Sequence, residues 1–208
     1  MEFCKAVDAL RELISCADKK KLHEELLPIY RYVQICHRIG RYISVCWING
    51  NQLFDAQIFQ ETDSLSQDPS GYLEVTCAMH KSEHIINELL KSGKPADVPE
   101  GIYKTGKGKN REIVSNPIVY DRLQHVNNFL PYIECAIRKK AKINYPGGTT
   151  LVVLCYLNTI YMNEDWIYLI ESLEERLSGF TIPFQEVLLI DNNSKHETFL
   201  KLPRCVNL

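Results

Sequence analysis

Two short stretches decide the fold of this chain: LFDAQIFQ at 53–60 and YLEVTCAM at 72–79. The first alternates apolar and polar residues, which is the period of a half-buried strand, and the second is rich in β-branched and aromatic residues. A polar loop at 61–71, which closes on proline and glycine, separates them. Together with a β-branched and aromatic run at 44–49, they predict an antiparallel meander of three strands over 44–79.

Helices and buried strands are predicted before and after this meander. The segments expected to be helices, most with apolar residues at spacings of three and four, are 5–16, 22–43, 80–92, 121–142 and 163–177. The further segments expected to be strands, two of them continuous apolar runs and the last an edge strand, are 151–157, 186–190 and 196–202. This order predicts an α/β fold in which a mixed central sheet is flanked by helices.

The length of the chain indicates its domain organisation. With 208 residues, of which 45% are hydrophobic, it is expected to form a single domain over 1–208 with a substantial core. Residues 1–20 are expected to form an N-terminal helical arm. Residues 93–118 combine proline, glycine and the basic run KTGKGKNR, and they are expected to form an irregular basic loop within the domain.

Charge and cysteine usage exclude several classes of protein. A formal net charge of −2 excludes a surface that is basic all over, although it leaves room for a local basic face. The eight cysteines show no regular spacing, which argues against a secreted disulfide scaffold. No basic segment followed by an apolar run marks a signal peptide, and the apolar run at 151–157 is shorter than the ~20 residues of a membrane span. We therefore expect a cytoplasmic protein without a membrane partner.

Asp55 and Glu74 are the strongest candidates for chemistry. They lie on adjacent predicted strands, so their carboxylates can face each other if both point to the same side of the sheet. Mg²⁺ is bound by one or two carboxylates, supplemented by other oxygens and water, and it can activate water against a phosphodiester. The alternative is that both are ordinary carboxylates facing solvent.

The order of helix, three-strand meander, helix and strand, with Asp55 at the start of the second strand and Glu74 in the third, resembles the PD-(D/E)XK nuclease superfamily. The resemblance spans roughly residues 20–160 and implies a restriction-endonuclease-like sheet. It implies that Asp55, Glu74 and the backbone carbonyl of Val75 bind Mg²⁺ or Mn²⁺. It also implies an assisting glutamate on the first helix, for which Glu25 and its neighbour Glu24 are the candidates.

One position departs from the family pattern. The family's lysine, two residues after the glutamate, is Thr76 here, and threonine cannot supply the positive charge that orients or activates the attacking water. Phe54 also replaces the family's proline. Thr76 or Gln57 could position water instead, or a lysine from a helix could reach the site. The lysines available for that role are Lys81, Lys139, Lys140 and Lys142.

Two basic clusters are candidates for binding nucleic acid. Lys107, Lys109 and Arg111 fall in the glycine-containing loop, and Lys139 and Lys140 lie at a predicted helix end. Lysine and arginine provide the phosphate contacts of nucleic-acid-binding proteins. A solvated loop, and cations that interact with the helix dipole, are the structural alternatives.

Two further motifs are weak. The segment from Gly101 to Gly108 is close to a phosphate-binding loop, but it lacks the hydroxyl residue and the preceding strand. Cys77, His80 and His84 have spacing that could hold zinc, with no fourth ligand nearby in the sequence.

These observations predict a metal-dependent endonuclease that hydrolyses phosphodiester bonds in DNA, with Mg²⁺ or Mn²⁺ and no small-molecule cofactor. The first alternative is a catalytically inactive domain of the same fold that binds nucleic acid or protein, with a homodimer through its apolar helices left open. The second alternative is a zinc-binding regulatory module.

Overall fold

The computed structural model describes residues 21–37, 43–48, 50, 52–60, 69–96, 99–106, 112–121, 123–156, 162–193 and 195–203. Its helical elements are the π-helical turn η1 (Leu22–Leu26), α3 (Leu27–Cys36), α4 (Glu83–Lys91), the 3-10 turn η2 (Pro99–Gly101), α5 (Gln124–Lys140) and α6 (Asn163–Leu177). Its strands are β1 (Ile43–Trp47), β2 (Ala56–Gln60), β3 (Gly71–Ala78), β4 (Ile102–Thr105), β5 (Glu112–Ser115), β6 (Thr149–Cys155), β7 (Glu186–Asp191) and β8 (Glu197–Phe199).

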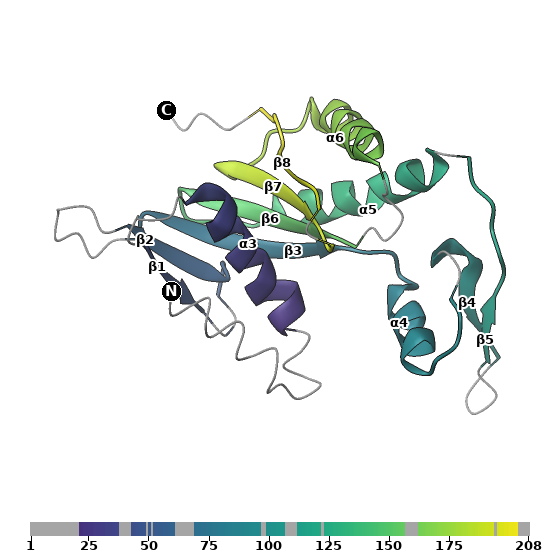
Figure 1. Cartoon of the computed structure of the whole chain (residues 1–208). Helices are drawn as coiled ribbons and strands as arrows, with labels where there is room; N and C mark the ends of the chain where they lie inside the picture. Colours follow the sequence, from purple (N-terminus) through teal and green to yellow (C-terminus); the bar gives the residue numbers. More distant parts are fainter. Residues whose placement is uncertain are drawn as a thin grey trace.

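The centre of the molecule is a mixed sheet of six strands in the order β1-β2-β3-β6-β7-β8 (Figure 1). Strands β1, β2 and β3 pair antiparallel, which confirms the predicted meander. Strands β3, β6 and β7 pair parallel, and β8 returns antiparallel at the edge, as expected for the last strand. The predicted α/β class with a mixed sheet is therefore correct.

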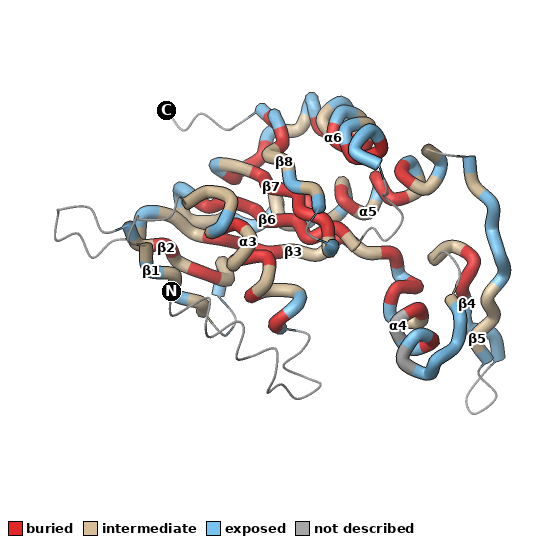
Figure 2. The backbone as a smooth tube through the Cα atoms, in the orientation of Figure 1, coloured by how far each residue is buried: buried red, intermediate tan, exposed pale blue. Residues whose placement is uncertain are grey.

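Helices cover both faces of this sheet, and each face has its own core. Helix α3 packs on one face against Val152 and Leu154 of β6. Helices α5 and α6 pack on the other face, against Leu151 and Val153 of the same strand. Every residue of β6 is buried as a result, and Figure 2 shows the central strands as the most buried part of the chain. This agrees with the continuous apolar sequence of a strand that is covered on both faces.

Two predicted helices end elsewhere than expected. The helix expected over 22–43 ends at Cys36, where His37 takes extended backbone angles, and Ile43 already belongs to β1. Pairing of Ile43 and Val45 with β2 prevails over helix formation there, as β-branched residues favour. The helix expected over 121–142 runs only from Gln124 to Lys140, whereas the helix expected over 163–177 is confirmed at both ends. The arm at 1–20, including the helix expected at 5–16, lies outside the described residues.

The segment 93–118 is not an irregular loop throughout, which corrects the expectation. Strands β4 and β5 form an antiparallel hairpin within it, with Ile102 opposite Ser115 and Thr105 opposite Glu112. The hairpin and α4 form a small lobe beside the main sheet, beyond the end of β3 (Figure 1). Its own core consists of three buried side chains: Ile86, Leu89 and Ile102.

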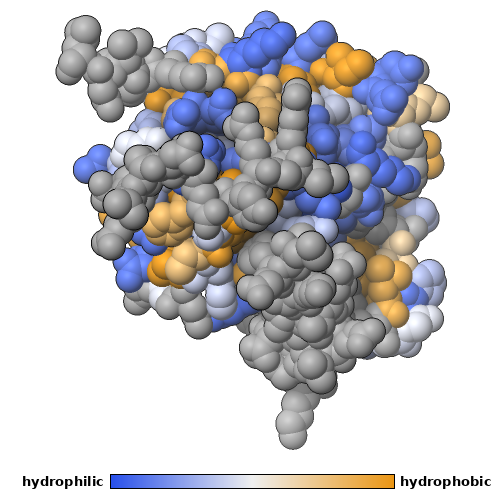
Figure 3. Space-filling model, turned by 60° about the vertical axis from the view of Figure 1, so that its left-hand side comes forward, coloured by the Kyte–Doolittle hydropathy of each residue, from blue (hydrophilic) through white to orange (hydrophobic). Residues whose placement is uncertain are grey.

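The surface has no dominant apolar region in the view of Figure 3. Where described atoms are visible there, hydrophobic side chains form small separate groups among hydrophilic ones. Within the described part of the chain, no helix combines the length and the apolar character that crossing a bilayer requires.

Candidate active site

Asp55 lies where strands β2 and β3 stop pairing, a place that we call the β2–β3 fork. The pairing of β2 with β3 runs from Ile58 opposite Gly71 to Ala56 opposite Leu73. Just before Ala56, the backbone N–H of Asp55 donates to the carbonyl of Leu73 at 2.8 Å, and Asp55 Oδ2 accepts a hydrogen bond from the backbone N–H of Val75 at 2.7 Å. The Asp55 carboxylate therefore continues the ladder with its side chain where strand pairing ends.

This contact also sets the direction of the Val75 carbonyl. The N–H and C=O groups of one residue in an extended strand point to the same side, as the paired bonds of antiparallel ladders show. Because the Val75 N–H points to Asp55, its carbonyl oxygen points toward the same fork. A carboxylate oxygen and a backbone carbonyl are thus directed to one place.

Glu74 is buried on the face of the sheet that α5 covers, and it pairs with the last residue of that helix. Its exposed fraction is 6%, and Lys140 Nζ donates a hydrogen bond to Glu74 Oε1 as an ion pair. Burial raises the pKa of Glu74, and the charge of Asp55 raises it further, while the hydrogen bond from Lys140 acts in the opposite direction. Lys140, one of the four lysines that the sequence left open, is thus in direct contact with Glu74.

Asp55 shares this electrostatic environment. Burial raises the pKa of Asp55, the Val75 hydrogen bond lowers it, and the charges of Glu25 and Lys140 act in opposite directions. Glu25, on η1, is oriented by the Trp47 indole, whose Nε1 donates to Glu25 Oε2 at 3.3 Å. Asp55, Glu74, Lys140 and Glu25 thus belong to one cluster, assembled from the start of β2, from β3, from the end of α5 and from η1.

Tyr145 is a member of the site that the sequence did not single out. It lies in the connection between α5 and β6, directly before Pro146, Gly147 and Gly148. Burial raises the pKa of Tyr145 above its ordinary range, and the negative charge of Glu74 adds to this effect. Its phenol is therefore a neutral O–H group beside the carboxylates. Nothing in the local sequence distinguishes it from a core tyrosine.

The remaining candidates lie in different places. Thr76 is two residues after Glu74 and therefore on the same face of β3. Lys139 is exposed on α5, next to Lys140. Lys107, Lys109 and Arg111 lie outside the described residues, so their proposed contacts stay predictions.

The zinc alternative is not supported by the positions of its ligands. His80 is buried, and its Nδ1 accepts a hydrogen bond from the Ser82 backbone N–H at 3.1 Å. Cys77 instead packs against the core on the α3 face, and its thiol contacts the backbone carbonyl of Glu24, in η1, at 3.8 Å. In the part of the chain that the structure describes, no three histidine, cysteine or acidic side chains form a group that could hold a metal.

The oxygen atoms at the fork nevertheless suit a hard divalent cation. Mg²⁺ is held in many proteins by one or two carboxylates, with water completing its shell, and does not need a cage of three acidic side chains. Asp55, Glu74 and the Val75 carbonyl supply such oxygens, whereas soft thiolate or imidazole ligands are not part of this cluster. The donor set therefore fits Mg²⁺ or Mn²⁺.

Comparisons with protein-family models, with curated proteins and with solved structures find no match to this chain.

Proposed function

We propose that this chain is a metal-dependent nuclease of the PD-(D/E)XK type that hydrolyses phosphodiester bonds in DNA. The observation that carries the proposal is the contact between Lys140 Nζ and Glu74 Oε1. It brings a lysine ammonium group to the carboxylate pair although the lysine expected in the sequence motif is Thr76. The site therefore holds the same chemical groups as the family's site, with the lysine contributed by helix α5.

The roles of the side chains follow from their chemistry. Asp55, Glu74 and the Val75 carbonyl would hold Mg²⁺ or Mn²⁺, which polarises a phosphodiester and lowers the pKa of water when bound. The Lys140 ammonium group donates hydrogen bonds, so it can orient the attacking water and stabilise negative charge on the phosphate oxygens. Fixing these groups on a sheet and a packed helix reduces their reorganisation during the reaction.

Lys139 supports a nucleic-acid substrate. It is exposed at the C-terminal end of α5, one residue before the catalytic lysine that we propose. A lysine at this position can contact a backbone phosphate next to the one being hydrolysed.

The test is cleavage of plasmid and single-stranded DNA by the purified chain with Mg²⁺, Mn²⁺ or EDTA. We expect cleavage that requires the metal and falls by about 100-fold or more in Asp55→Asn, Glu74→Gln and Lys140→Ala, because each removes a charge at the reacting centre. Lys94→Ala is the matched control, since Lys94 is exposed in the α4–β4 connection, and it should cleave like the wild type.

A folded wild-type protein that cleaves none of these DNA forms with either metal would contradict the proposal. If that protein still shifted DNA in EDTA, the non-catalytic binding domain would be the better description of this fold. Equal losses in Lys140→Ala and Lys94→Ala would remove Lys140 from the reaction.

A further inference from the structure

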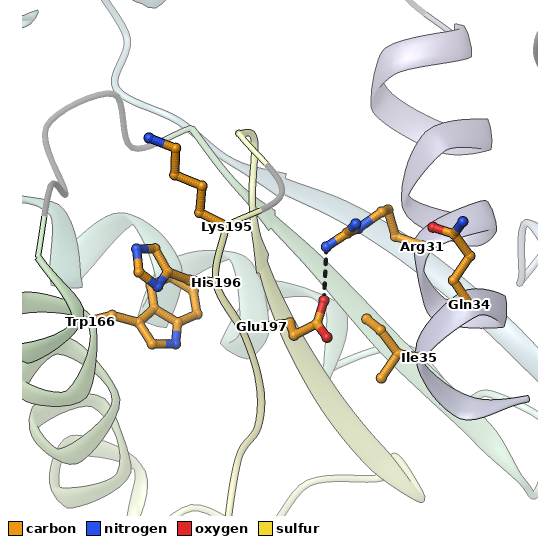
Figure 4. Close-up of a pocket in the computed structure, with 7 residues that line it drawn as sticks. All are labelled: Arg31, Gln34, Ile35, Trp166, Lys195, His196 and Glu197. Carbon is orange, nitrogen blue, oxygen red and sulfur yellow. Dashed lines mark hydrogen bonds and ion pairs between the residues drawn. The ribbon is translucent and has the colours of Figure 1, made fainter. Parts of the chain in front are cut away.

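A cavity lies at the β8 edge of the sheet, away from the β2–β3 fork. It has a volume of about 380 Å³ and opens between α3, the first turns of α6 and the connection from β7 to β8 (Figure 4). This volume falls in the range of small-ligand sites. The residues that line it are Arg31, Gln34, Ile35, Trp166, Lys195, His196 and Glu197.

One wall of the cavity is a stacked pair of aromatic rings. The His196 imidazole lies on the Trp166 indole, with ring centroids 5.4 Å apart and an interplanar angle of 18°. Trp166 is 5% exposed, and its Nε1 donates to Thr198 Oγ1 at 2.9 Å, which fixes the indole against β8. His196 is partly exposed above it (Figure 4). The histidine is thus a supported platform on which a further planar ring can stack.

A buried carboxylate fixes the backbone that carries this platform. Asp191, at the end of β7, is 3% exposed. Its Oδ1 accepts hydrogen bonds from the backbone N–H groups of Lys195 at 2.8 Å and His196 at 3.2 Å. The backbone of both residues is therefore anchored to Asp191 beside the cavity, which lowers the backbone entropy that remains to be lost when a ligand binds.

The charges of the cavity favour an anion. Arg31 pairs with Glu197 at 2.8 Å, which leaves the Lys195 ammonium group as the excess charge among the lining side chains. A cation beside an aromatic platform matches the two parts of a nucleotide, because bases stack on aromatic rings while phosphates contact lysine and arginine.

We propose that this cavity binds a nucleotide, with its base stacked on His196 and its phosphate at Lys195. The site involves neither Asp55 nor Glu74. It lies beside β8, whereas the carboxylates lie at the β2–β3 fork, and strands β6 and β7 separate the two. The inference therefore does not depend on the proposed nuclease activity, and binding here can be measured without any divalent metal.

The experiment is calorimetric titration of the full chain in EDTA with deoxyadenosine monophosphate. We expect saturable binding that weakens at least about five-fold in His196→Ala, since the variant removes the ring on which the base would stack. Lys195→Ala should weaken binding by about five-fold, because it removes one partly solvated phosphate contact. The matched control is Lys201→Ala, an exposed lysine just beyond β8 and outside the cavity lining, which should bind as the wild type does.

Two companion titrations identify the ligand's parts. Inorganic phosphate should bind more weakly than the nucleotide, and equal binding of both would overturn the proposal because the platform would then contribute nothing. A strand of six deoxyadenosine nucleotides distinguishes a nucleic-acid strand from a free nucleotide as the ligand. Tighter binding of the strand than of the monophosphate indicates a nucleic-acid strand, and binding that is no tighter indicates a free nucleotide. The proposal would also be overturned if neither the monophosphate nor the strand bound saturably, or if Lys195→Ala and Lys201→Ala bound the nucleotide with equal affinity.

Discussion

Glu74 and Lys140 show how one buried carboxylate is made compatible with the core. Moving a carboxylate out of water is costly unless it is paired and hydrogen-bonded, and Glu74 lies beside Asp55, which adds repulsion. Lys140 offsets this cost because it ends a helix whose apolar face is fixed in the core, while its own side chain remains partly exposed. The lysine that we propose for catalysis therefore also makes the burial of this carboxylate tolerable.

This balance predicts the outcome of a stability experiment. Lys140→Ala should lower the free energy of unfolding by about 1–3 kcal/mol, because it leaves a buried acceptor unsatisfied. The double variant Lys140→Met with Glu74→Gln should recover most of that loss, since removing both charges is often neutral. Urea unfolding at neutral pH measures both, and equal destabilisation of the single and double variants would contradict the pairing.

The proposed nuclease should need a lysine ammonium group beside Glu74, whichever position of the sequence supplies it. Thr76 lies on the same face of β3 as Glu74, so a lysine there can reach the same carboxylate. We predict that adding Thr76→Lys to Lys140→Ala raises the cleavage rate at least about ten-fold over Lys140→Ala alone, because it returns one positive charge to the site. Thr76→Arg in the Lys140→Ala background is the control, because arginine supplies the charge without the compact ammonium group of lysine. If Thr76→Lys did not raise the cleavage rate, the proposed role of the lysine would be contradicted.

The sequence revealed part of this site and not the rest for a definite reason. Asp55 and Glu74 could be placed together because they are on neighbouring strands of one meander, whose pairing is local in sequence. Lys140 is separated from Glu74 by 66 positions, and its approach depends on how α5 crosses the sheet. Tyr145 reaches the carboxylates only because of the turn that leads into β6. Such contacts have no periodic signal in the sequence.

At the scale of elements, the connection between β3 and α4 (residues 79–82), which we call the elbow, is a turn with buried polar side chains. His80 Nδ1 accepts from the Ser82 backbone N–H, and Ser82 Oγ donates to the Ile102 carbonyl at 2.9 Å, which joins the helix to the hairpin. Glu83, the first residue of α4, is only 3% exposed. Burial, reinforced by the negative charge of Glu100, raises the pKa of Glu83 to about 7.

This carboxyl group predicts a pH-dependent stability of a defined sign. Between pH 4.5, the ordinary pKa of a glutamate, and about pH 7, folded Glu83 keeps a proton that the unfolded chain has released. The free energy of unfolding should therefore fall as pH rises through this window, by about 3 kcal/mol at most, and then level off. Glu83→Gln should remove this decline, because glutamine resembles the protonated acid.

Urea titrations from pH 4.5 to 8 measure the difference between the two proteins. That difference isolates Glu83 from His80, whose pKa is lowered by burial and whose titration changes stability in the opposite direction. Glu175→Gln, at an exposed position of α6, is the control for loss of one carboxylate. Parallel profiles for Glu83→Gln and the wild type would show that Glu83 titrates alike in both states.

Elements were predictable where one pattern governs many residues. Helix α6 was found at both ends because its apolar stripe runs through all its turns, from Trp166 to Leu177. The β4–β5 hairpin was missed because each strand has four residues, and prolines and glycines around them suggested a loop. The α3 helix was extended too far because its period continues past Cys36, where pairing of β1 with β2 takes over.

At the scale of the whole molecule, the described residues form two large cores on the faces of the sheet and smaller ones beside them. The two faces of the sheet share every strand from β3 to β7, so their cores are joined through the same backbone. The α4–β4–β5 lobe has a small core of its own. It is joined to the sheet through the elbow and through an exposed connection after β5, in which Val119 is 95% exposed (Figures 1 and 2).

This division predicts that the lobe opens independently of the sheet. Ile102→Ala should destabilise the lobe locally, because Ile102 is 2% exposed within its small core, and the exchange of amide hydrogens in β4, β5 and α4 should accelerate by about ten-fold or more. Amides of β6 and β7 should exchange as in the wild type, and the midpoint of global unfolding should change little.

Leu173→Ala supplies the contrast that makes the prediction testable. Leu173 is fully buried between α6 and the sheet, so its truncation should lower the free energy of global unfolding by about 2–5 kcal/mol and accelerate exchange in β6 and β7. Mass spectrometry of hydrogen exchange resolves the two patterns. Equal acceleration by Ile102→Ala in the hairpin and in β6 would instead make the lobe part of one cooperative unit with the sheet. Loss of its small core would then be transmitted to β6, the strand that pairs with the Glu74 strand β3.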